Sequence, residues 1–248
     1  MNRAITTSAI GASVLLAATG IAWWVRRGAP APLLPPTVIP LVSPIITVDV
    51  AEEVLSHMEH LPPDEATLVL HTDGGEVTAC VLIADALRKF RHSTAIVPYM
   101  ALSGGTLIAL NATRLQLGKN AALSAVDPVI AGQRARHIPK NDEKNASPLH
   151  PLAQEYDSAV RDYLGESLRA RLGAGASPAA LERAMSVFMG LKAPHSWPIH
   201  AGQLHGLGIP VEPADIQWSR IVDELRRARP RQYFVLGAQL PESRRALP

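Results

Sequence analysis

Short apolar runs and longer stretches with helical spacing alternate along the middle of the chain. Residues 67–71 and 93–98 are rich in β-branched and aliphatic side chains, as short buried strands are. Residues 77–90 and 106–113, which follow them, place apolar side chains at the intervals of an amphipathic helix. Repeated strand and helix units of this kind predict an α/β fold with a parallel sheet and a right-handed crossover.

A pair of glycines separates strand from helix in both units. Gly74 and Gly75 end the first strand, and Gly104 and Gly105 follow Ser103 after the second. Because a crossover brings the carboxyl ends of parallel strands to one edge of the sheet, we expect the two turns to face each other across a cleft. A serine at this edge lies at a helix N-terminus, where unpaired N–H groups stabilise negative charge.

Ser103 is therefore the candidate nucleophile of an acyl-transfer site. The backbone amides around Gly74 and Gly75, together with that of Gly104, are the candidate oxyanion hole. The simpler alternative is that Ser103 only caps the following helix, because serine is a preferred N-cap residue.

The N-terminal segment, residues 1–27, predicts a single-pass membrane anchor. Residues 4–25 carry no charge and are long enough to cross a bilayer core of about 30 Å, and Arg26 and Arg27 end the apolar run. A cleaved signal peptide is the alternative. The arginine pair beside the membrane favours a cytoplasmic location for the domain that follows.

The remaining chain divides into a tether, one folded domain and a tail. Residues 28–44 contain six prolines and no charge, which predicts an extended tether. The folded domain is expected over residues 45–213, with a helix from about residue 50 capped by Asp49. Residues 214–248 hold a C-terminal helix and an arginine-rich tail.

The second half of the domain begins with a polar segment. Residues 131–150 lack periodicity, so we expect a long loop, and long loops are often functional. Apolar spacing predicts an amphipathic helix over residues 152–172. Ser177 and the proline after it predict the start of another helix.

Composition removes several classes of protein. The net charge of +2 and the few aromatic residues give no nucleic-acid footprint. The single cysteine, Cys80, excludes an intramolecular disulfide and is expected in the core. Neither metal-ligand spacing nor a cofactor-binding motif is present in the sequence, so we expect no cofactor.

Three ordered motifs resemble one known family. They are His71-Thr-Asp-Gly-Gly, Pro98-Tyr-Met-Ala-Leu-Ser-Gly-Gly-Thr and Ser124-Ala-Val-Asp-Pro-Val-Ile. They resemble the serine dehydrogenase proteinase (SDH) family, which belongs with signal peptide peptidase A in the ClpP/crotonase superfamily. The resemblance implies a spiral core of repeated β-β-α units, protein or peptide substrates, and assembly into homo-oligomers. Asp73 stands where this family usually has proline, which alters the turn but keeps both glycines.

Five residues are candidates for the general base that activates the serine. His71 directly precedes the first glycine turn and could reach the cleft, although a histidine at a strand end is more commonly bonded to backbone. The resemblance places Asp127 near the position of the ClpP histidine, but an orienting role suits a carboxylate equally well. Lys140 and Lys144 fall in the polar segment, where the peptidase A branch can place the lysine of a Ser-Lys dyad. His195, in Pro-His-Ser-Trp-Pro-Ile, is a natural base at neutral pH. We favour a loop lysine as the base and His195 as a residue that orders the cleft.

These observations predict a membrane-anchored serine peptidase that hydrolyses peptide bonds through an acyl-enzyme on Ser103. The alternative is a catalytically silent scaffold of the same fold, or a hydrolase acting on a non-peptide acyl group. The family name also carries a serine dehydratase association, but the sequence contains no pyridoxal-phosphate lysine motif.

Overall fold

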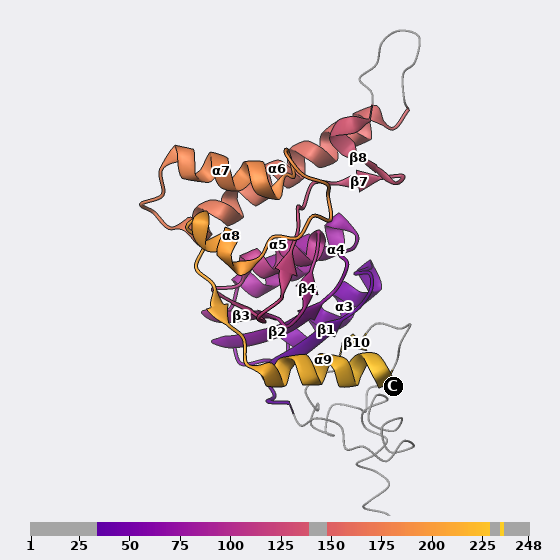
Figure 1. The fold of residues 1–248 in the computed structure, drawn as a ribbon. Coiled ribbons are helices and arrows are strands. Elements are labelled where there is room, and N and C mark those ends of the chain that lie inside the picture. The colour runs from indigo at the N-terminus through magenta and orange to yellow at the C-terminus, as the bar shows by residue number, and fades with distance from the viewer. Residues whose placement is uncertain (1–33, 139–147, 229–233, 236–248) are drawn as a thin grey trace, which may run out of the picture.

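The computed structural model describes residues 34–138, 148–228 and 234–235. The main sheet of this part has the strand order β10-β1-β2-β3-β5-β9, and all its neighbours pair in parallel except β10 with β1 (Figure 1). The predicted α/β fold with a parallel sheet is confirmed. The strands are β1 (Val38–Val42), β2 (Glu65–His71), β3 (His92–Val97), β5 (Arg114–Leu117), β9 (Glu212–Pro213) and β10 (Phe234–Val235).

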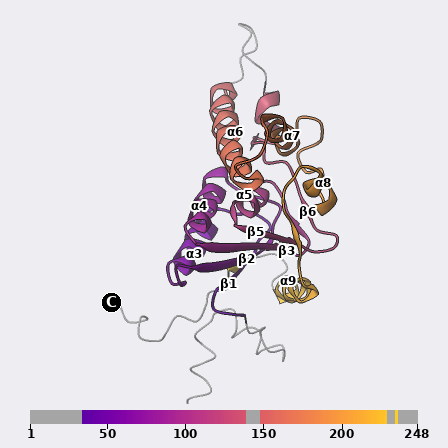
Figure 2. The same ribbon diagram turned by 90° about the vertical axis from the view of Figure 1, so that its left-hand side faces the viewer.

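Helices cover both faces of this sheet, and on one face further helices pack outside the first helical layer. Figure 2 shows α3 and α4 on one side of the sheet and α9 on the other, while α6 and α7 lie at the far end of the molecule from α9. The helices are α3 (Val48–Met58), α4 (Val77–Arg88), α5 (Gly104–Asn111), α6 (His150–Leu172), α7 (Pro178–Phe188), α8 (Ala201–Gly206) and α9 (Ile216–Ala228).

The alternation of side chains along the strands builds two cores. In β1, Ile39 and Leu41 belong to the large core under α3, α4 and α5. Val38 and Val42 point to the other face, where they pack with Val222 and other residues of α9. Side chains that alternate in this way bury both faces, so the sheet excludes water on each side.

Strand β1 corrects the predicted tether. The sequence places residues 28–44 in an extended proline-rich spacer, whereas all five residues of β1 are buried in the sheet. Thr67 donates its N–H to the carbonyl of Thr37, so the alternation of a parallel ladder turns the nitrogen of Pro40 away from β2. Although Pro40 has no N–H, no hydrogen bond to β2 is therefore lost. On its other side β1 pairs, among the described residues, only with the two-residue β10, and proline is tolerated in such a strand.

The first helix begins earlier than predicted. Thr47, not Asp49, is the N-cap of α3, and its hydroxyl accepts a 3.4 Å hydrogen bond from the N–H of Val50. Asp49 lies in the first turn, where a carboxylate favours the helix dipole.

The segment after β6 (Ala122–Leu123) is more ordered than its polar composition suggests. It forms a hairpin of β7 (Val129–Ile130) and β8 (Gln133–Arg134), followed by a short 3-10 helix, η1 (Ala135–His137). Of the described residues in the predicted loop 131–150, those of β8 and η1 therefore have regular structure. Residues 139–147 lie outside them.

The predicted helices of the second half are confirmed. Helix α6 covers residues 152–172, and Ser177 caps α7 by accepting a 3.2 Å hydrogen bond from the N–H of Ala180. Arg88 of α4 fixes α6 against the core, since its guanidinium donates to Asn111 at 2.5 Å and to Ser167 at 2.8 Å. The same group stacks over the ring of Tyr163 at 4.6 Å.

Among the described residues, we find no helix both long enough and apolar enough to cross a membrane. The predicted anchor over residues 4–25 lies outside these residues and stays a prediction.

Candidate active site

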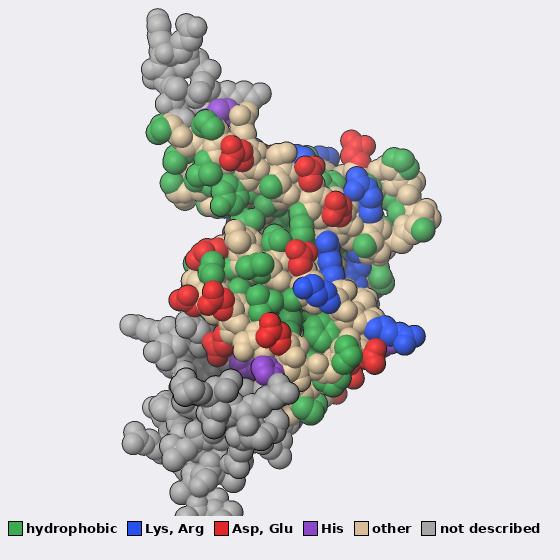
Figure 3. Space-filling model, turned by 180° about the vertical axis from the view of Figure 1, so that it is seen from behind, with side chains coloured by type: hydrophobic (Ala, Val, Ile, Leu, Met, Phe, Trp, Pro, Cys, Tyr) green, Lys and Arg blue, Asp and Glu red, His purple; other side chains and the backbone are tan. Residues whose placement is uncertain are grey.

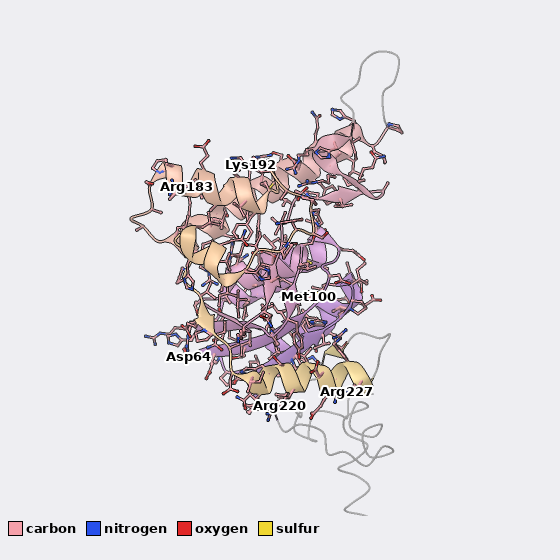
Figure 4. The ribbon with its side chains drawn as sticks, viewed as in Figure 1. Asp64, Met100, Arg183, Lys192, Arg220 and Arg227 are labelled. Carbon is pink, nitrogen blue, oxygen red and sulfur yellow. The ribbon has the colours of Figure 1, made fainter. Side chains whose placement is uncertain are left out.

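The two glycine turns meet at the carboxyl ends of β2 and β3. Thr72, which follows β2, pairs with Ala101 in β4 (Met100–Ala101), and β4 in turn pairs in parallel with β6. A Cβ added to Gly74 would lie 2.7 Å from the Cβ of Ser103, and Gly74 has φ +118°. Only glycine lets the two turns approach this closely. Figure 4 labels Met100 of β4 between Lys192, which follows α7, and helix α9, so β4 lies at the centre of the molecule.

Ser103 has an unusual backbone conformation. Its φ is 48° and its ψ is −117°, and it lies directly before α5. A non-glycine residue with positive φ is strained by about 1–3 kcal/mol, and such strain collects at functional sites. The Ser103 side chain makes no capping hydrogen bond, so the simpler interpretation of this serine as an N-cap does not describe it.

Hydroxyl groups hold the Ser103 backbone in place. The Ser103 N–H donates to Oγ of Ser124 at 2.8 Å, and the N–H of Ser124 donates to Oγ1 of Thr106 at 2.9 Å. The Thr106 hydroxyl donates at 2.6 Å to the carbonyl of Ala101, two residues before Ser103. Ser124 is a site residue that the sequence pattern did not predict. The only local signal is a lone hydroxyl within the apolar run at residues 121–126.

Two of the three predicted oxyanion donors are available. The N–H of Gly74 is already engaged, since it donates to Oγ1 of Thr72 at 3.1 Å. Within the described part of the chain, neither the N–H of Gly75 nor that of Gly104 donates a hydrogen bond. A Cβ on Gly104 would lie 3.6 Å from the Gly75 nitrogen, so the two free donors are neighbours. Gly104 is also the first residue of α5, where the helix dipole favours an anion.

Asp73, which stands where the family usually has proline, makes a backbone hydrogen bond in this turn. Its N–H donates a 3.3 Å hydrogen bond to the carbonyl of Pro44, a bond that proline could not make. The aspartate therefore fastens the turn to the chain before α3.

Asp127, which is buried, forms a pair with the half-buried His195. Nδ1 of His195 lies 3.0 Å from Oδ1 of Asp127, and the Asp127 side chain is only 1% exposed. Because an ionised carboxylate only accepts hydrogen bonds, Nδ1 carries the proton and Nε2 is left as an acceptor. Nε of Arg134 lies 2.5 Å from Oδ2 of Asp127, and Arg136 lies 3.6 Å from the same oxygen.

These partners keep Asp127 ionised. Burial alone would raise the pKa of the carboxyl, but the hydrogen bonds from His195 and Arg134 outweigh burial and hold this pKa below its ordinary value. A carboxylate with a lowered pKa is a poor general base, so Asp127 suits the orienting role that the sequence left open.

The predicted site residues fall into two groups that are joined through the backbone. Ser103, Gly75 and Gly104 make one group, and Asp127 and His195 make the other. The chain that binds Ser103 through Ser124 reaches Asp127 three residues later. Within the described residues, no hydrogen bond joins the Ser103 hydroxyl to a base, and Lys140 and Lys144 lie outside them.

Comparison with known proteins decides the family. A family model for ClpP-like SDH-type serine proteinases matches residues 37–217. The chain belongs to this family. The match begins next to β1, which supports a folded domain that starts earlier than residue 45.

Two curated proteins match about two thirds of this chain. Uncharacterized proteins MJ0137 and MJ1495 of Methanocaldococcus jannaschii are each 32% identical, over 181 and 175 residues. These matches cover 69% and 67% of this chain but only 62% and 59% of the relatives. The chain thus spans about three fifths of the relatives that it matches.

A solved structure shows the same fold. ClpP1 from Listeria monocytogenes superposes with a TM-score of 0.50 at 15% identity, covering 73% of this chain and 94% of ClpP1. The predicted membership of the SDH family within the ClpP-like group is confirmed.

A pocket of about 170 Å³ lies beside the Asp127–His195 pair. Ala193 and Pro194, which precede His195, form part of its wall, and Trp197 is 58% exposed. The other lining residues are Ala125, Ser186, Val187, Gly190, Lys192, Ile199 and Gln203.

Two further titratable residues lie beneath the turns. Cys80 is fully buried behind Gly104, as predicted for a core residue, and burial raises its pKa to about 12. His71 packs edge-on against Tyr99 at 5.9 Å, and Tyr99 donates a 2.8 Å hydrogen bond to Asp223 of α9. Burial, followed by the charge of Arg226, lowers the pKa of His71 to about 4.

Proposed function

We propose that this SDH-type protein is a serine peptidase that hydrolyses peptide bonds through an acyl-enzyme on Ser103. One observation carries the proposal. The strained Ser103 has a hydroxyl free of hydrogen bonds among the described residues, beside the two unpaired N–H groups of Gly75 and Gly104. Unpaired N–H groups beside a nucleophile can form an oxyanion hole for the substrate carbonyl oxygen.

The reaction then follows ordinary acyl-transfer chemistry. Oγ of Ser103 loses its proton to a base and attacks the substrate carbonyl carbon, and the carbonyl electrons move onto oxygen. The N–H groups of Gly75 and Gly104 stabilise this oxyanion. Collapse of the intermediate expels the amine, which takes the proton from the base, and water releases the acyl group by the same steps in reverse.

We propose His195 as the base, with Asp127 as its orienting group. Support comes from the 3.0 Å contact that fixes the tautomer of His195 and leaves Nε2 free to accept a proton. Asp127 is ionised and almost fully buried, as suits a residue that holds an imidazole in one orientation. The lysine alternative, Lys140 or Lys144, is tested separately below.

The surroundings of the site complete the proposal. Residues 4–25 would anchor the protein in a membrane, with the domain on the cytoplasmic side, and peptides or unfolded proteins would be the substrates. Self-association is supported by apolar side chains at the surface, including Ile45, Val48 and Leu82. Figure 3 shows such side chains gathered over the middle of the face that carries α3 and α4, with acidic side chains around them.

A fluorophosphonate probe together with a peptide-turnover assay tests the function. The wild-type protein is expected to be labelled on Ser103 and to cleave an unstructured protein. Ser103→Ala should abolish both signals, whereas Ser56→Ala on the exposed surface of α3 should change neither. A wild-type protein that the probe does not label would favour the silent scaffold. A labelled protein that hydrolyses an ester substrate but no peptide would favour the non-peptide acyl hydrolase.

A further inference from the structure

The guanidinium group of Arg134, in β8, binds two separate parts of the chain next to the Asp127–His195 pair. Its Nε donates to Oδ2 of Asp127 at 2.5 Å. Its two terminal nitrogens donate to the carbonyls of Ala193 at 2.9 Å and Gly190 at 2.7 Å, in the segment that leads to His195. The same side chain therefore fixes both the acceptor of His195 and the backbone that carries His195.

The Arg134 guanidinium packs closely against the backbone at Gly190. Gly190 has φ +60°, and a Cβ there would collide with the Arg134 guanidinium and lie 2.9 Å from the Cβ of Ala125. Arg134 is only 16% exposed. A planar fork with several donors fits this set of acceptors, whereas the single ammonium of a lysine could satisfy only part of it.

Arg136, the second arginine of the cluster, shares the carbonyls of Met189 and Gly190 with Arg134 but lies farther from Asp127. It donates to the carbonyls of Met189 and Gly190 at the end of α7, and it stands 3.6 Å from the Asp127 carboxylate. Arg134 is therefore the direct partner of Asp127, and Arg136 mainly secures the helix end.

We propose that Arg134 is a positioning residue of the peptidase reaction, which acts through Asp127 to orient His195. This inference rests on the proposed function and deepens it, since it names a residue that positions the catalytic groups of the same site without touching substrate. Arg134 binds Oδ2 of Asp127 while Oδ1 contacts Nδ1 of His195, so the guanidinium fixes the orientation of the carboxylate toward the imidazole.

The charges around the pair give the direction of the effect. Asp127 faces Arg134 from β8, Arg136 from η1 and His195, while Asp157 and Arg161 of α6 act on Arg136. Without Arg134, the Asp127 charge is less compensated and stabilises a protonated imidazole more strongly. The acid limb of the kcat profile should then move to higher pH.

The experiment compares Arg134→Met with Arg134→Lys in the full-length protein. We expect Arg134→Met to lose about 100-fold in kcat, the cost of a misplaced catalytic group, with a much smaller change in KM and the acid limb shifted to higher pH. Arg134→Lys keeps the charge, so its acid limb should stay near that of the wild type while its kcat still falls. Arg183→Met, an exposed change on α7, is the matched control for loss of an arginine and should behave as the wild type.

Several outcomes would overturn the inference. Wild-type kcat in Arg134→Lys would show that the fork is not needed, and a folded Arg134→Met with an unchanged pH profile would show that Asp127 does not transmit the effect. If Arg134→Met fails to fold, the kcat of Arg134→Lys and the rate at which the probe labels it still test the inference. Labelling of wild-type Ser103 with equal rates in both variants would refute the inference alone, whereas an unlabelled wild type would refute the proposed function.

Discussion

The backbone N–H of Ser103 donates a 2.8 Å hydrogen bond to the hydroxyl of Ser124. Ser124 is fully buried and lies directly after β6, the strand that pairs with β4 beside the nucleophile. The strained backbone of Ser103 is thus held by a specific hydrogen bond that does not involve its own hydroxyl.

Replacing Ser124 with alanine should therefore impair both stability and turnover. The Ser103 N–H would lose its acceptor, at a cost of about 1–3 kcal/mol, and the strained conformation would relax. We expect a lower melting temperature and at least about a tenfold fall in kcat, measured by thermal unfolding and peptide cleavage.

A buried serine far from the site provides the control. Ser167 in α6 also makes hydrogen bonds, to Tyr163 and Arg88, so Ser167→Ala should lower the melting temperature but leave kcat unchanged. Equal kcat in the two variants would show that Ser124 is only a structural residue.

Gly74→Ala should disrupt the meeting of the two turns. Its new Cβ would lie 2.7 Å from the Cβ of Ser103 and 3.1 Å from the carbonyl oxygen of Leu102, at a φ of +118° that alanine rarely adopts. We expect Ser103 to be displaced and fluorophosphonate labelling to be lost. Gly202→Ala in α8, where a Cβ would meet nothing within 4 Å, should keep full labelling. Normal labelling of Gly74→Ala would contradict the close approach.

His71 should make the stability of the protein depend on pH. Its pKa is lowered from 6.5 to about 4 in the folded protein, so the unfolded chain binds the proton at higher pH. The contribution of the neutral side chain is complete above pH 6.5 and is lost as the pH falls towards about 4, by at most about 3 kcal/mol. Urea unfolding at pH 7.5 and pH 5 measures this loss.

The matched variants are His71→Gln and His205→Gln. His71→Gln should lose less stability than the wild type between the two pH values, whereas the exposed His205→Gln serves as the control for removal of a histidine. The same pH dependence in wild type and His71→Gln would contradict the buried, neutral state of His71.

The sequence predicted the parts of the site that depend on local pattern. Ser103 and the glycine pairs follow from the order of strand, turn and helix, because each unit carries its own spacing. Strand β1 was missed because six prolines outweighed the apolar run, although Pro40 can occupy that position of the strand.

Three features of the site depend on contacts that the local sequence does not show. Ser124 meets Ser103 only because β4 and β6 pair, a contact that spacing along the chain does not reveal. Arg134 lies in a polar segment without periodicity, so its convergence on Asp127 could not be predicted from the residues around it. The engaged N–H of Gly74 is likewise a detail of turn geometry that the glycine pair alone does not specify.

The identity of the base can be decided by comparing His195→Ala with the double variant Lys140→Ala and Lys144→Ala. Asp127 is ionised and almost fully buried, and it holds His195 with Nε2 free, so His195→Ala should abolish turnover as completely as Ser103→Ala does. Members of one catalytic unit are not additive, so the combined variant Ser103→Ala and His195→Ala should be no worse than either change alone.

The lysine variants give the opposing outcome. If His195 is the base, the double lysine variant keeps most of its activity, and its rate falls towards acid pH as in the wild type. Asp127→Asn should then lower kcat strongly while Ser103 stays in place, because an amide no longer fixes the tautomer of His195 or stabilises its protonated form. An inactive double lysine variant together with an active His195→Ala would instead establish the Ser-Lys dyad. Asp127 and His195 would then serve only to order the cleft, and Asp127→Asn should change the melting temperature more than the rate.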